Sequence, residues 1–132
     1  MLVKTIKYKD YNGEEREENF YFNLDETEIF KMELSTSGGI QAYVNKIVSE
    51  KNGKRIIDMF EEIVLKAYGE KSLDGKYFDK SEEISNRFKH TNAYNVLMME
   101  ICTDAKRAAD FINAIIPKDE SNKNTPAITP VN

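Results

Sequence analysis

The sequence predicts an α+β fold in which an amino-terminal β-hairpin packs on a mostly helical bundle of about five or six helices. Residues 1–24 alternate polar and apolar side chains with the period of two that a half-buried strand requires. From residue 25 to residue 117, apolar residues recur instead with the 3.6-residue period of amphipathic helices. We expect residues 1–117 to form a single domain. Residues 118–132 have neither period nor any aromatic residue, and we expect them to form a disordered tail.

The register of the hairpin selects its turn. A two-residue turn at Asn12-Gly13 would set the apolar faces of the two strands against each other. A three-residue loop, Tyr11-Asn12-Gly13, removes this conflict if Asp10 begins a type I turn and Gly13 takes the left-handed bulge position. It also brings lysines opposite glutamates on the outer face, which is mildly favourable. The expected pairs are Leu2 with Phe22, Lys7 with Glu17, and Lys9 with Glu15.

Three helices are expected between residues 25 and 69. Asp25 and Glu28 form a D-x-x-E capping box, which predicts a first helix running to about Leu34. Thr36-Ser37-Gly38-Gly39 predicts a break. The second helix carries the apolar stripe Ile40, Tyr43, Val44, Ile47 and Val48, and it is closed by Lys51-Asn52-Gly53. The third and longest carries Ile56, Ile57, Phe60, Ile63, Val64, Ala67 and Tyr68. Gly69 is expected to end it as a left-handed residue.

The remaining chain up to residue 117 predicts a turn and three further helices. Leu73-Asp74-Gly75-Lys76 is typical of a tight turn, and a short extended piece follows it. Ser81 is expected to cap a short helix. Thr91 and Thr103 are interpreted as the starts of the next two helices, although each also fits an exposed position in one continuous helix. The last helix has a small alanine face that would let a neighbour approach closely, and Pro117 is expected to stop it.

Composition argues against several classes of partner. The net charge is −4 and the 19 basic residues are interleaved with 23 acids, so a broad nucleic-acid surface is not expected. No apolar run approaches the ~20 residues that span a bilayer, and the amino terminus lacks the apolar core of a signal peptide. The single cysteine, Cys102, lies in an apolar run, which fits an inert thiol in a reducing compartment. A cytoplasmic protein is expected.

The sequence contains no recognisable catalytic constellation. His90 is the only histidine, and no H-E-x-x-H or C-x-x-C spacing accompanies it. The acidic clusters are better explained as solvated strand and helix faces than as metal sites. Gly38-Gly39 precedes a helix but lacks the lysine and the further glycines of a phosphate loop. We therefore expect neither an enzyme nor a bound cofactor or metal.

Partner binding through apolar side chains is the remaining possibility. Methionines lie in or beside the helical stripes, and this side chain adapts to irregular partners, although ordinary core filling explains the same spacing. The grooves flanking the longest helix and the last helices are the expected contact region. The candidate partner-binding residues are Met59, Tyr68, Tyr77, Phe78, Tyr94, Met98 and Met99.

Three stretches together resemble the tail assembly chaperones of long-tailed bacteriophages and prophages. The first is KAYGEKSLDGKYFDKSEEISNRF at residues 66–88, followed by Thr91-Asn92-Ala93-Tyr94, and the stretches are specific as an ordered pattern. The others are the opening KYKDYNGEEREENFYFNLDETEI at residues 7–29 and the ending ADFINAIIP at residues 109–117. The resemblance extends over residues 1–117.

This resemblance implies a protein without catalytic residues. Such chaperones bind the long, helix-rich tape-measure protein in the host cytoplasm, keep it soluble, help recruit the tail-tube protein, and are generally absent from the mature virion. Many also exist as a longer form made by ribosomal frameshifting, whose junction would fall in the tail of this chain. Homo-oligomers are left open. Two alternatives also stay open: a structural tail-completion or connector protein of the virion, and a small phage regulatory protein that binds a host target.

Overall fold

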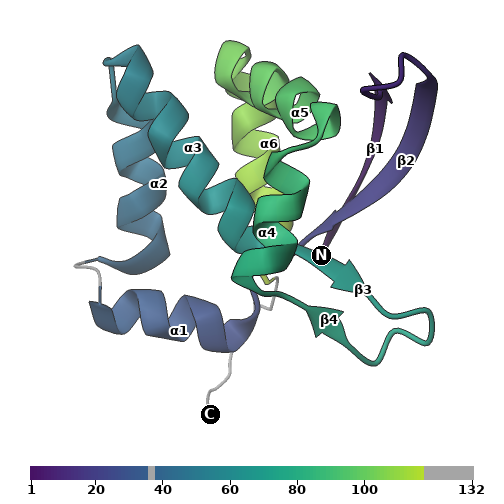
Figure 1. Ribbon diagram of the computed structural model, residues 1–132. Coiled ribbons are helices and arrows are strands. Elements are labelled where there is room, and N and C mark those ends of the chain that lie inside the picture. The colour runs from purple at the N-terminus through teal and green to yellow at the C-terminus, as the bar shows by residue number, and fades with distance from the viewer. Residues whose placement is uncertain (36–37, 118–132) are drawn as a thin grey trace.

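The computed structural model describes residues 1–35 and 38–117, which form one four-stranded antiparallel sheet and six helices (Figure 1). The predicted α+β class is thereby confirmed. Residues Thr36 and Ser37 of the expected break and the expected disordered tail, residues 118–132, lie outside the described residues. Among the described residues, no helix is both long and apolar enough to cross a membrane. The elements in order are β1 (Leu2–Lys9), β2 (Glu15–Phe22), α1 (Glu26–Ser35), α2 (Gly39–Ser49), α3 (Gly53–Ala67), β3 (Tyr68–Lys71), β4 (Phe78–Asp79), α4 (Glu82–Lys89), α5 (Asn92–Thr103) and α6 (Ala105–Ile115).

The hairpin of β1 and β2 has the predicted turn and register. The Asp10 N–H donates to the Glu14 carbonyl at 2.9 Å, and the Gly13 N–H donates to the Asp10 carbonyl at 2.9 Å. Gly13 has a φ of 85°, the left-handed conformation that the bulge position requires. The predicted pairs are all present: Leu2 faces Phe22, Lys7 faces Glu17, and Lys9 faces Glu15. The apolar face of the hairpin packs on α5.

The end of α3 differs from the prediction. Gly69 is not a left-handed cap: α3 ends at Ala67, the chain continues in an extended conformation through Tyr68, and Gly69 lies within β3. There it pairs with Tyr21 of β2, so the sheet order is β1-β2-β3-β4. A Cβ at Gly69 would lie 2.6 Å from the Phe78 ring and 2.9 Å from the Asp79 carbonyl oxygen. The glycine is required by this close approach of β4.

Side-chain caps begin three of the six helices, α1, α4 and α5, where the sequence predicts them. The Asp25 and Glu28 side chains each accept the other's backbone N–H, at 2.8 and 3.0 Å, which completes the capping box. The Ser81 hydroxyl accepts the Ile84 N–H at 3.1 Å, and Thr91 likewise caps α5. These caps fix where the chain enters each helix because they satisfy N–H groups that have no partner within the helix.

The start of α6 is one residue later than expected. Asp104, rather than Thr103, is the cap: its carboxylate accepts the N–H groups of Lys106 and Arg107 at 3.0 and 3.2 Å. Thr103 is the last residue of α5, and its hydroxyl bonds back to the Met99 carbonyl. Asp104 has an extended conformation, so α5 and α6 are separate helices.

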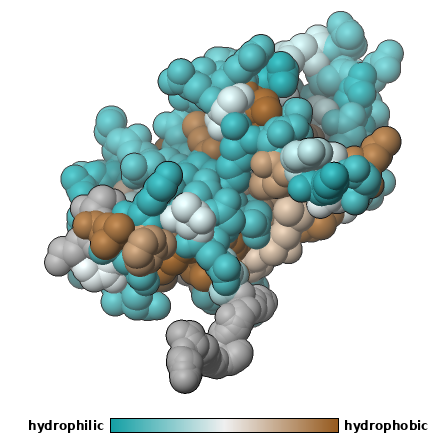
Figure 2. Space-filling model, turned by 90° about the horizontal axis from the view of Figure 1, so that it is seen from below, coloured by the Kyte–Doolittle hydropathy of each residue, from teal (hydrophilic) through white to brown (hydrophobic). Residues whose placement is uncertain are grey.

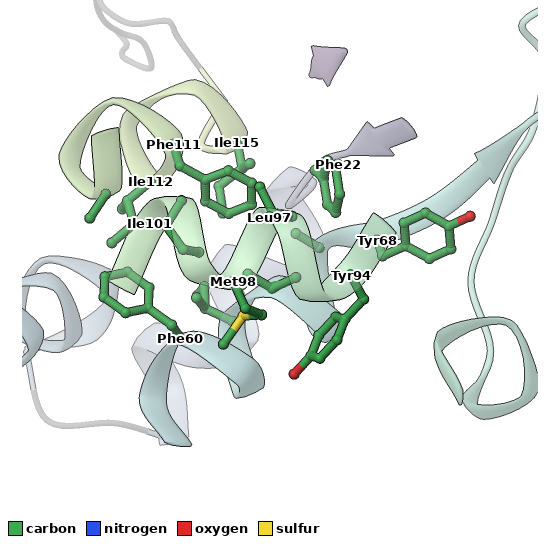
Figure 3. Packing of buried hydrophobic residues seen from close by; sticks show 14 of the residues in the cluster. Phe22, Phe60, Tyr68, Tyr94, Leu97, Met98, Ile101, Phe111, Ile112 and Ile115 are labelled. Carbon is green, nitrogen blue, oxygen red and sulfur yellow. The ribbon is translucent and has the colours of Figure 1, made fainter. Parts of the chain in front are cut away.

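The core lies where the sheet, α3, α4, α5 and α6 converge (Figure 3). Tyr68 stacks on Phe88 with ring centroids 4.2 Å apart, and the Phe22 ring meets Phe111 edge-on at 5.3 Å. The backbone joins these elements too, because the Leu24 N–H donates to the Ile115 carbonyl at 2.8 Å. The segment between β2 and α1 is therefore tied to the end of α6.

Candidate functional site

Four of the seven predicted partner-binding residues lie in this core. Met59, Tyr68, Tyr94 and Met98 are each at most 9% exposed. The Tyr94 hydroxyl donates to a Glu61 carboxylate oxygen at 2.9 Å, and burial together with this bond raises its pKa. Figure 3 shows Tyr68, Tyr94 and Met98 among the packed side chains. Their burial agrees with the core-filling alternative, and a partner would reach little of their surface in the folded chain.

The other three predicted residues do not share one surface. Met99 is 64% exposed on α5, whereas Tyr77 is 60% exposed beside β4, in the hairpin that points away from the helices (Figure 1). Phe78 is half-buried, since its ring lies against Gly69. The structure thus does not bring the predicted residues together as a site, and their role in partner binding stays a prediction.

An apolar groove elsewhere in the molecule has the properties of a binding site. We call it the alanine groove: it has a volume of about 480 Å³ and runs between α2 and α3 on one side and α5 and α6 on the other. Its walls are apolar or small, namely Val44, Ile47, Ile56, Phe60, Ile101, Cys102, Ala105, Ala108, Ala109 and Ile112. Ala105 and Ala109 are exposed while Ala108 is buried, so part of the alanine face of α6 is left uncovered within the described chain.

Two carboxylates at the rim of the alanine groove, those of Glu50 and Asp104, already have partners. Glu50 accepts the Asn52 N–H and the Arg55 guanidinium, both at 3.1 Å, and these contacts hold the pKa of its carboxyl below the usual value. The Asp104 carboxylate accepts backbone N–H groups from the first turn of α6. Because these carboxylates are already hydrogen-bonded, the groove offers mainly apolar surface.

Cys102 lies in the wall of the groove. Its thiol is half-buried, and burial raises its pKa, so little of the reactive thiolate forms near neutral pH. The residue is the only cysteine of the chain, which makes it a chemical reporter of whether the groove is occupied.

A second apolar feature lies on α1. Phe30 and Leu34 are 60% and 73% exposed and are one helical turn apart. Helix α1 forms the lower side of Figure 1, and Figure 2, seen from below, shows hydrophobic patches on this face among hydrophilic atoms. Neither residue lines the alanine groove.

The described residues do not assemble a metal site. They contain no group of three or more metal-ligating side chains. His90 caps the end of α4, where its Nδ1 lies 2.6 Å from the Asn86 carbonyl oxygen. We therefore take the alanine groove as the candidate functional site of the described chain.

The sequence contained a signal for the groove that did not identify it. The alanines of α6 indicated a close neighbour, but the apolar wall opposite them comes from α2 and α3, about 60 residues earlier in the chain. Which helices face each other across an open space is a property of the packing.

Comparison with known proteins identifies the family. The family model described as phage tail assembly chaperone matches residues 1–127, which include every described helix and strand. The chain matches no curated protein and no solved structure.

Proposed function

The chain belongs to the phage tail assembly chaperone family, and from this premise we propose that it binds an amphipathic helix of the tape-measure protein in the alanine groove. By covering apolar stripes of that client, it keeps the client soluble in the host cytoplasm until tail-tube subunits are recruited. It then leaves, so the mature virion lacks it.

The shape of the groove carries this proposal. The small side chains Ala105 and Ala109 on one wall let another helix approach closely, and Val44 and Ile56 oppose them across the opening. An amphipathic helix lays its apolar face into a groove of this kind through residues spaced three and four apart. The volume of about 480 Å³ accommodates the side chains of such a face, with the client backbone remaining above the rim.

The expected affinity of one copy is modest. Each apolar side chain that the groove buries contributes about 1.5–3 kcal/mol, but association itself costs at least ~4 kcal/mol. Several copies on one long client would gain avidity without any new type of contact. The carboxylates at the rim, Glu50 and Asp104, are already paired with Arg55 and Arg107, so the groove selects its client by apolar surface rather than by charge.

A pair of arginine substitutions tests the groove. Ala109→Arg places a long charged side chain in it at an exposed position, whereas the matched control Asn95→Arg adds the same charge to an exposed position of α5 that does not line it. Each variant is co-expressed with the tape-measure protein of the same phage, and the soluble client is quantified and run on a sizing column. We expect the control to keep the client soluble and co-eluting, and Ala109→Arg to lose both at unchanged thermal stability.

Cys102 gives an independent readout. Its maleimide labelling at pH 8.5, measured by mass spectrometry of the chain, should slow at least about tenfold when the client is bound, because the groove is then covered. If the client still co-elutes with the Ala109→Arg variant, and Cys102 is labelled as fast with the client as without it, then the client binds outside the groove. Presence of the chain in purified virions would instead favour a connector protein.

A further inference from the structure

Strand β1 has an open edge. It is the first strand in the order β1-β2-β3-β4, so only one of its edges has a neighbouring strand. Asp10 uses both its N–H and its carbonyl within the turn. Because the direction of these groups alternates along a strand, those of Lys4, Ile6 and Tyr8 also point towards β2. The backbone groups of the alternate residues Val3, Thr5 and Lys7 therefore point away from the sheet.

The open part of this edge has a defined length. At one end the Lys9 carbonyl is already occupied, since it accepts the side-chain amide of Asn92 at 2.8 Å. Val3, Thr5 and Lys7 have no backbone partner on their outward side among residues 1–35 and 38–117. The free edge therefore extends from Val3 to Lys7, roughly 16 Å at the usual rise per residue of a strand.

The edge is basic. Strand β1 contains three lysines, Lys4, Lys7 and Lys9, and no acid. Lys4 is held by Glu100 at 2.5 Å, whereas Lys7 and Lys9 face Glu17 and Glu15 of β2 but lie within ion-pair distance of no acid among the described residues. Lysines on an edge discourage pairing with strands of the same charge, which selects against uncontrolled association. An approaching acidic strand would be favoured by the same charges.

A second groove opens beside this edge. It has a volume of about 470 Å³ and separates the start of β1 from α5 and α6; its apolar lining is Leu2, Ile101, Phe111 and Ala114. Leu2 and Lys4 belong to the inner face of β1. In a strand added to β1, every second side chain lies on that same inner face. One of these side chains would therefore enter the groove.

We propose that the Val3–Lys7 edge accepts one extended, acidic segment of a partner protein as a fifth strand of the sheet. The backbone of β1 supplies the hydrogen bonds, Lys7 and Lys9 attract carboxylates on the outer face, and the second groove receives an apolar side chain. A second copy of this chain fits less well, because it would bring its own helices to the side of the sheet where α5 and α6 already flank β1 (Figure 1). A lone strand needs only about 4.8 Å of width.

The probe is a fluorescein-labelled nine-residue peptide with glutamate at its even positions, leucine at its centre and threonine elsewhere. Binding to the full chain is followed by fluorescence anisotropy at low salt. We expect saturable binding that weakens as salt is added. The matched peptide with lysine in place of glutamate should bind at least about tenfold more weakly.

Two proline variants separate the edge from the rest of the hairpin. Thr5→Pro removes an N–H that points away from β2, so the ladder between β1 and β2 is kept. Asn19 is the cross-strand partner of Thr5, and the two side chains bond each other at 2.7 Å. Asn19→Pro therefore deletes the same side-chain bond and removes an N–H on the opposite edge of the hairpin. We expect Thr5→Pro to reduce peptide binding at least about tenfold and Asn19→Pro to leave it unchanged.

The inference does not depend on the alanine groove, so Ala109→Arg should bind the peptide normally. Circular dichroism and thermal unfolding verify that both proline variants are folded. Equal binding by the two proline variants, equal binding of the two peptides, or no binding of the acidic peptide to the unmodified chain at about 1 mM would each overturn the proposal. A concentration-dependent dimer that Thr5→Pro abolishes would show that a second copy occupies the edge instead.

Discussion

Gly69→Ala is the most informative stability test of this fold. The added Cβ would lie 2.6 Å from the Phe78 ring and 2.9 Å from the Asp79 carbonyl oxygen, well inside ordinary contact. The φ of Gly69 is not positive, so alanine is not strained by the backbone itself. The destabilisation therefore comes from pushing β4 away from β3. Overpacking of this kind costs about 1–3 kcal/mol, or roughly 4–15 °C in Tm for a domain of this size.

The assay is urea unfolding followed by circular dichroism, performed as a double-mutant cycle with Phe78→Ala. Shortening Phe78 removes the nearer of the two contacts, so the double variant should be more stable than the sum of the single effects by at least about 1 kcal/mol. A left-handed cap at Gly69 would behave differently, because the penalty of alanine would then be independent of Phe78. A Gly69→Ala change below about 0.5 kcal/mol, or a coupling near zero, would refute the reasoning.

Three further perturbations test the turn, the last helix and the core. The Arg16 guanidinium and backbone N–H groups hold the pKa of the Asp10 carboxyl below its usual value. The stabilisation of the fold by this carboxylate is therefore present above about pH 4 and is lost as the pH falls. The difference in unfolding free energy between the unmodified chain and Asp10→Ala should shrink from pH 7 to pH 3. Asp104→Ala should lose about 1 kcal/mol through the missing cap of α6, and Thr103→Ala clearly less. Leu97 is fully buried, so Leu97→Ala should cost about 2–5 kcal/mol in urea unfolding.

Each of these has a definite contrary outcome. An Asp10→Ala gap that is constant with pH would mean that the carboxylate does not stabilise the turn through its charge. Equal losses for Thr103→Ala and Asp104→Ala would place the start of α6 where the sequence alone put it. A Leu97→Ala loss below about 1 kcal/mol would contradict the tight packing around α5 in Figure 3.

The features that the sequence alone determined are local. The hairpin turn and its register follow from residues 2–22, because a one-residue slip would reverse both the apolar face and the charge pairs. The capping box of Asp25 and Glu28 and the caps at Ser81 and Thr91 are likewise set within four residues. Such contacts need no knowledge of the rest of the fold, and all of them were predicted at the observed positions.

The tertiary structure decided what lies far apart in the chain. A glycine at position 69 is expected both for a helix cap and for a close contact between strands. Only the approach of β4 in the folded chain shows that the second explanation applies. Tyr94 and Met98 have a helical spacing that suits core or surface equally, and the packing of α5 between the sheet and α3 buried them. The alanine groove exists because α6 packs on α5 while α2 and α3 stop short of Ala105 and Ala109. The period of an apolar stripe shows which face of a helix it occupies. The position of the neighbouring helices decides how much of that stripe stays uncovered.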